Sequence, residues 1–132
     1  MEAKEKYDYW LDIAQYDLDS ADAMATSRRW LYTVFMCQQA IEKLIKGLYI
    51  IYVDDDIPRI HNINAIIGKF EEKLPLPVSE ENKELFRKLS MYYISNRYPD
   101  YLAKLSGQIK ETEATEILRQ TKEVFKWLLT LA

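Results

Sequence analysis

The run Asn96-Arg97-Tyr98-Pro99-Asp100 gathers a guanidinium, a phenol and a carboxylate around a proline. The planar fork of an arginine holds phosphate groups well, and a nearby carboxylate can orient it. We therefore interpret Asn96, Arg97 and Tyr98 as lining a pocket for a phosphate or a base, with Asp100 orienting the guanidinium. The alternative is an Arg97–Asp100 ion pair that only locks a chain reversal, and the sequence leaves both open.

His61 is the only histidine of the chain, and histidine side chains exchange protons near neutral pH. Cleaving RNA without a metal needs a base for the 2′-hydroxyl and a cation at the phosphate. His61 and Arg97 are the candidate catalytic residues for these two roles, on the condition that the fold brings them together. The alternative is that His61 caps a helix or makes a hydrogen bond in the core.

A third group of polar residues lies on a segment that is otherwise apolar. Gln38, Gln39 and Lys43 are candidate ligand contacts from this segment. The alternative is that they belong to a polar stripe that faces solvent or a second subunit. Gln39 and Lys43 lie on this polar stripe together with Glu42 and Lys46.

The residue inventory argues against metal and cofactor chemistry. No Glu-x-x-His pair for a di-iron bundle, no zinc-binding Cys/His set and no phosphate-binding glycine loop is found. The aspartates of the first helix are interpreted as a solvated acidic face. We therefore expect no metal and no cofactor. Those aspartates are Asp8, Asp12, Asp19 and Asp22.

Composition limits the class and the compartment. The net charge of −3 argues against a protein that binds nucleic acid through bulk positive charge. Cys37, the single cysteine, fits a reducing cytoplasm and lies in an apolar stripe as an inert core residue. The N-terminus lacks a signal-peptide pattern, and the apolar stretch 44–53 is too short to cross a membrane. We expect a cytoplasmic protein of one domain, residues 1–132.

The elements that must position these residues are helices. Apolar residues recur at steps of three and four, and no strand pattern is found. Asp17, at the edge of the first apolar stripe, needs a cationic partner from another helix. Helices are predicted at about 4–26, 29–53 and 62–72, then from the Ser79 cap to about Arg97, then at 112–131, and 101–110 is ambiguous.

The helix at 29–53 is predicted to be central, because it is apolar on every side except that of its polar stripe. Thr33, Ala40 and Gly47 form a second stripe of small residues spaced by seven. Small side chains let another helix backbone approach closely, which explains a glycine within a helix. The predicted fold class is all-α, an up-and-down four-helix bundle with an additional short helix.

Four pieces of this sequence together resemble the HEPN domain family. Asp17-Leu18 followed by Ala21 is similar to the first-helix pattern of that family, and His61-Asn62-Ile63 to the start of a later helix. Arg97-Tyr98-Pro99-Asp100 is similar to the motif of one subgroup. The second-helix signature is matched by Arg29-Trp30 and by the run Cys37-Gln38-Gln39-Ala40-x-Glu42-Lys43-x-x-Lys46.

The resemblance implies a homodimeric helical bundle that binds nucleotides or RNA. It also implies pairing with a minimal nucleotidyltransferase in a toxin–antitoxin-like module. The Arg-x(4–6)-His motif of the family's ribonucleases is absent, because no histidine follows Arg97. The leading hypothesis is therefore a binding module of this kind. Its alternatives are a metal-independent endoribonuclease toxin that uses Arg97 and His61, and a dimeric assembly domain without catalysis.

Overall fold

The computed structural model describes the backbone of residues 2–93 and 99–132, and the side chains of these residues except 99–102 and 105. Within these ranges the chain forms helices and no strand, so the predicted all-α bundle is confirmed. The elements are α1 (Ala3–Thr26), α2 (Trp30–Tyr52), α3 (Ile63–Ile67), the 3-10 helix η1 (Glu71–Lys73), α4 (Glu80–Met91), α5 (Pro99–Gln108) and α6 (Glu111–Leu129).

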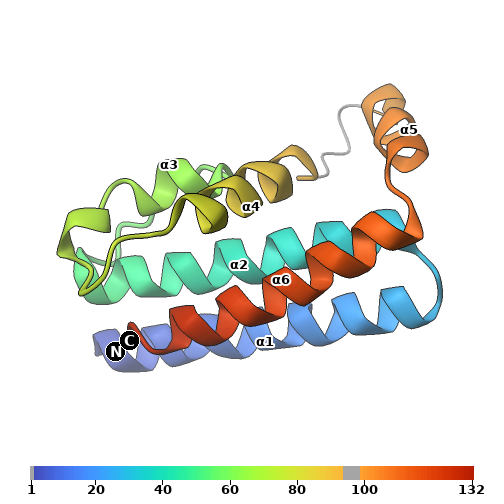
Figure 1. The fold of residues 1–132 in the computed structure, drawn as a ribbon. Helices are drawn as coiled ribbons and strands as arrows, with labels where there is room; N and C mark the ends of the chain where they lie inside the picture. The colour runs from blue at the N-terminus through green and yellow to red at the C-terminus, as the bar shows by residue number, and fades with distance from the viewer. Residues whose placement is uncertain (1, 94–98) are drawn as a thin grey trace.

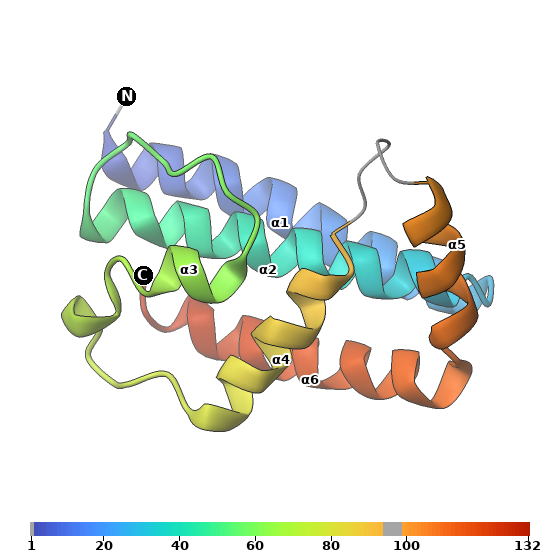
Figure 2. The same cartoon turned by 90° about the horizontal axis from the view of Figure 1, so that it is seen from above.

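Helices α1 and α2 form an antiparallel hairpin, and α6 lies along both of them (Figure 1). The shorter helices α3 and α4 pack on another side of α2, and α5 stands at the far end of the bundle (Figure 2). Helix α2 is therefore central, as its largely apolar surface predicted. Among its residues only Tyr32 is exposed.

The close contact between α1 and α2 depends on Gly47. A Cβ atom added at Gly47 would lie 3.2 Å from Cβ of Trp10 and 3.2 Å from Cδ2 of Tyr7. Thr33 and Ala40, the other members of the small-residue stripe, are fully buried. The interpretation of this stripe as a site of close helix approach is confirmed at Gly47.

The turn between α1 and α2 is unusual because Arg28 has a φ of 61°. This left-handed conformation costs a residue with a side chain about 1 kcal/mol or more. The Arg28 guanidinium donates to Glu111 at the start of α6 over 2.8 Å and lies 5.8 Å from the ring of Trp30. These contacts hold the turn against the first residue of α6.

Two predicted helix ends were wrong. The helix expected at 62–72 ends at Ile67, because Gly68 caps it and Phe70 then turns into the core, where its ring stacks on Tyr52. The helix expected to reach Arg97 ends at Met91, where Tyr92 takes the C-cap position. A proline such as Pro99 limits how far a preceding helix can run without requiring it to run that far.

The ambiguous stretch 101–110 belongs largely to α5, which begins at Pro99. Proline is favoured in the first helical turn, because its missing N–H group has no helical partner there. Pro99 is therefore the first residue of a helix. Ser106 and Gly107 lie near the end of this helix.

Candidate functional site

The carboxylate of Glu42 is the centre of a buried polar cluster on α2. Its Oε1 accepts a hydrogen bond from Nε2 of Gln38 over 2.7 Å, and its Oε2 accepts one from Nζ of Lys46 over 3.0 Å. Nδ1 of His61 lies 3.2 Å from Oε1 and 3.1 Å from Oε2. Gln38, Glu42 and Lys46 are buried. This cluster is therefore part of the interior, and its carboxylate contacts Nδ1 of His61.

Two further polar residues of α2 extend away from Glu42. Gln39 donates from Nε2 to Oε1 of Gln38 over 2.7 Å. Lys43 turns to the other side and forms an ion pair of 2.5 Å with the buried carboxylate of Asp17 on α1. The predicted need of Asp17 for a cationic partner from another helix is confirmed.

The imidazole of His61 stacks on the ring of Tyr93. The ring centroids are 3.8 Å apart and the planes differ by 11°. The ring of Phe35, on α2, is tilted against that of Tyr93, and their centroids are 6.5 Å apart. The His61 side chain is 45% exposed, and its Nε2 makes no hydrogen bond to the described part of the chain. One edge of this histidine is thus anchored in the interior while the other faces outward.

The backbone around His61 is fixed by caps and by a contact with α4. The side chain of Asn62 accepts from the N–H of Ala65 over 3.0 Å and so caps α3. The N–H of Ile63 donates to Oγ of Ser90 over 3.0 Å. These bonds satisfy free N–H groups at the start of α3, and they hold the connector between α2 and α3 beside α4.

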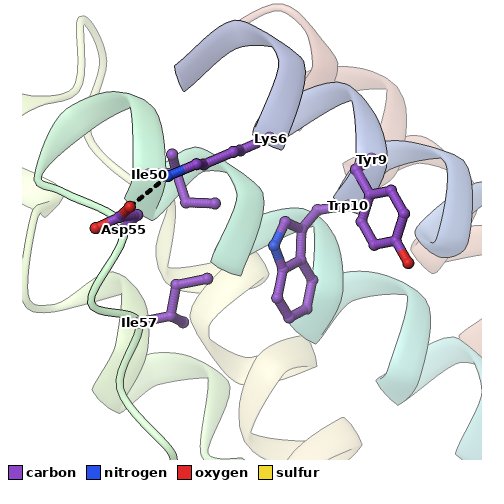
Figure 3. Close-up of a pocket in the computed structure, with 6 residues that line it drawn as sticks. All are labelled: Lys6, Tyr9, Trp10, Ile50, Asp55 and Ile57. Atoms are coloured by element: carbon purple, nitrogen blue, oxygen red, sulfur yellow. Dashed lines mark hydrogen bonds and ion pairs between the residues drawn. The ribbon is translucent and has the colours of Figure 1, made fainter. Parts of the chain in front are cut away.

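A groove lies beside this cluster, between α1 and the connector 53–62. It consists of one pocket of about 380 Å³ and one of about 320 Å³ that share Trp10 and Ile57. Figure 3 shows the first pocket, with Ile57 and the indole of Trp10 facing the same open space. We call the two pockets together the Trp10 groove, lined by Lys6, Tyr9, Trp10, Lys46, Ile50, Asp55, Ile57, Pro58, Arg59 and His61.

One end of the Trp10 groove is closed by an ion pair between Lys6 and Asp55 (Figure 3). The hydrogen bond from Lys6 and its positive charge lower the pKa of the Asp55 carboxyl group. The other end is closed by His61 and the Glu42 cluster. The connector is therefore tied to the bundle at two points, with the groove between them.

The structure brings together only part of the predicted site. Gln38 and Gln39 lie in one network with His61, whereas Lys43 belongs to the ion pair with Asp17. Asn96, Arg97 and Tyr98 lie outside the described residues. The backbone of Asp100 belongs to α5, and its side chain is not described. The pairing of Arg97 with His61 or Asp100 therefore stays a prediction.

Three residues of this region were not predicted as site residues. Glu42 and Lys46 had been assigned to a polar stripe, yet both are buried. The spacing of Gln38, Glu42 and Lys46 at i, i+4 and i+8 could have indicated them, since such residues share one helix face. Tyr93 was expected within the helix that begins at Ser79, and nothing in the sequence indicates that it stacks on His61.

Other candidate chemistry can be placed as well. Cys37 is buried beside Thr121, and burial raises the pKa of its thiol to about 12, which fits the predicted inert core residue. In the described ranges, no three His, Cys, Asp or Glu side chains are grouped so as to hold a metal ion. No described helix is both long enough and apolar enough to span a membrane.

Comparison with known proteins gives a family and a fold. The family model for the HEPN domain matches residues 7–131. The crystal structure of TT1696 from Thermus thermophilus is similar to this chain with a TM-score of 0.81, at 24% sequence identity, over 96% of this chain and 98% of that one. At this identity the likeness concerns the fold alone. No curated protein sequence matches the chain significantly.

Proposed function

Since this chain belongs to the HEPN domain family, we propose that it is a nucleotide- or RNA-binding helical domain that contacts its ligand through the His61–Tyr93 ring pair. The observation that carries the proposal is the outward-facing edge of His61 above a buried polar anchor. Proteins recognise unpaired bases by stacking them on aromatic rings, histidine included, and by hydrogen bonds to base edges. A ring held in a fixed position loses little freedom when it does so.

The polar residues around the ring pair have distinct parts in this proposal. Gln39 contacts the ligand, while Gln38 and Lys43 position the helix face through bonds they already make. The Asn96–Asp100 motif begins three residues after Tyr93 in the sequence. In the proposal its arginine holds a phosphate, Asn96 and Tyr98 contact the ligand, and Asp100 orients the guanidinium.

The family also supplies the proposed partners. We infer a cytoplasmic homodimer that acts with a minimal nucleotidyltransferase in a toxin–antitoxin-like pair. Affinity purification of the native protein from its own cells, followed by mass spectrometry, tests this part. Recovery of a small nucleotidyltransferase supports the pairing, and its repeated absence contradicts it. Sedimentation equilibrium of the purified chain tests the dimer separately.

The binding function is tested by fluorescence anisotropy with labelled single-stranded RNA and with labelled AMP. Tyr93→Ala should weaken binding by roughly 5- to 150-fold, since base stacking is worth about 1–3 kcal/mol. Arg97→Ala should also weaken binding, because it removes the proposed phosphate contact. Arg119→Ala is the matched control, because Arg119 is an exposed arginine of α6 that pairs with carboxylates of its own helix. Binding that none of these changes affects, or no binding at all, would favour the assembly domain instead.

A metal-independent endoribonuclease is the second candidate, and the orientation of His61 favours it. With Nδ1 held by Glu42, Nε2 can take a proton from a 2′-hydroxyl, whose oxygen then attacks the adjacent phosphorus and releases the 5′-oxygen. Arg97 would stabilise the charge that develops on the phosphate. Incubation with RNA in EDTA should then give 2′,3′-cyclic phosphate ends. Cleavage that survives in both His61→Ala and Arg97→Ala excludes this mechanism.

A further inference from the structure

The Trp10 groove has the features of a small-molecule site. Each of its two pockets exceeds 300 Å³, and ligand sites of about 300–1,000 Å³ are typically apolar with a few polar groups. The apolar walls are the indole of Trp10 on one side and Ile57 and Pro58 of the connector on the other. Ile50 of α2 lines the first pocket (Figure 3). A flat ring is the shape that fits between such walls.

The backbone geometry explains why Trp10 lines a groove instead of filling the core. Its Cβ lies directly over Gly47, where a larger residue would push α1 away from α2. The indole extends from that point toward the connector (Figure 3). A half-buried tryptophan with an open face is an effective stacking surface for an aromatic ligand.

Each charged side chain at the groove, except Arg59, has a partner of opposite charge. Lys6 is paired with Asp55, and Lys46 is paired with Glu42. Arg59 is exposed and makes no ion pair with any carboxylate in the described ranges. The groove therefore carries one surplus positive charge on a chain whose net charge is −3. A ligand with a single anionic group would complement it.

We propose that the Trp10 groove binds a small planar aromatic anion, with its ring between Trp10 and the Ile57–Pro58 wall and its carboxylate or phosphate group on Arg59. This site is separate from the proposed RNA contact at Tyr93 and does not depend on it. His61 borders both, so the test below leaves His61 unchanged.

The test uses isothermal titration calorimetry on the full chain with three probes. Indole-3-acetate and phenyl phosphate carry the two anionic groups, and indole-3-ethanol is the neutral match of the first. At least one anion should bind, and at least tenfold more tightly than indole-3-ethanol. Arg59→Gln should reduce the affinity for that anion to the level of the neutral probe, whereas Arg119→Gln should leave it unchanged.

Two results would overturn the proposal. One is that neither indole-3-acetate nor phenyl phosphate binds more tightly than indole-3-ethanol, and the other is anion binding that Arg59→Gln does not weaken. Trp10→Ala is a second variant, with circular dichroism used to check its fold, and it should abolish binding of both indoles. Labelled AMP separates this site from the proposed function. Loss of AMP binding in Tyr93→Ala but not in Arg59→Gln assigns AMP to the ring pair alone.

Discussion

Nδ1 of His61 and Oε2 of Glu42 lie 3.1 Å apart, although 19 positions separate the two residues in the sequence. An ionised carboxylate can only accept hydrogen bonds. Nδ1 of His61 must therefore carry a proton whenever this contact is made, and the neutral ring keeps its lone pair on Nε2, the nitrogen that faces outward. The buried Glu42 carboxylate therefore leaves Nε2 of His61 able to accept a hydrogen bond or a proton.

The tautomer of His61 can be observed directly, because the chain contains a single histidine. In nitrogen-15 spectra recorded where the ring is neutral, Nδ1 should give the signal of a protonated nitrogen and Nε2 that of an unprotonated one. Glu42→Leu should remove this preference, since it removes the acceptor. A protonated Nε2 in the native protein would contradict the assignment.

The Glu42–Lys46 pair should show strong coupling in stability. Glu42→Leu leaves the buried ammonium group of Lys46 unpaired, and breaking a buried pair in this way costs about 3–5 kcal/mol. The double variant Glu42→Leu/Lys46→Met should recover much of that loss, because no buried charge remains. Urea denaturation of the single and double variants measures both. A double variant less stable than Glu42→Leu would refute this account.

The two glycines that lie within helices, Gly47 of α2 and Gly107 of α5, should respond in opposite ways. Gly47→Leu should destabilise the fold by about 1–3 kcal/mol, because a side chain there meets Trp10 and Tyr7. Gly107→Ala should stabilise α5 by up to about 1 kcal/mol, since nothing lies within 4 Å of the added Cβ. Thermal denaturation followed by circular dichroism compares the two. The same sign for both would show that contact with α1 is not what requires Gly47.

Cys37 should be inert in the native protein. Its thiol pKa is raised to about 12 by burial, so almost no thiolate is present at pH 8, and the reactive form is the thiolate. A disulfide reagent such as DTNB should release one equivalent of chromophore in guanidinium chloride and almost none in buffer. Fast reaction of the native protein at pH 8 would mean that the core around Cys37 opens readily.

The Lys6–Asp55 pair predicts a dependence of stability on acid. The folded-state pKa of Asp55 is lowered from its ordinary value of 3.8, so the pair stabilises the fold above that value. The contribution is lost as the pH falls through the lowered pKa. Asp55→Asn should therefore reduce stability at pH 7 and make little difference near pH 2. Asp56→Asn, at an exposed neighbouring aspartate, serves as the control and should show no such difference.

The sequence predicted the bundle better than the site. Periodicity of three and four defined the long helices, and the Gly47 stripe indicated the close approach of a neighbouring helix, because both depend on local patterns along one helix. The structure identifies that neighbour as α1. The stack of His61 on Tyr93 joins residues from different elements, and no spacing rule connects them. The burial of Glu42 was missed for a related reason. A charged residue is expected to be exposed unless its partners are known, and one of them lies 19 positions away.

The connector between α2 and α3 is held at two points, by Asp55 to α1 and by His61 to α2. Residues 56–60 between these two contacts are in no helix. Extra residues inserted there would lengthen only a loop whose ends stay in place, and doubling the length of a flexible loop costs only about 0.6 kcal/mol. An insertion beside the exposed Asp56 should therefore leave the bundle and the Glu42 cluster in place, whereas one within 57–60 would disturb the lining of the Trp10 groove and residues packed against the core.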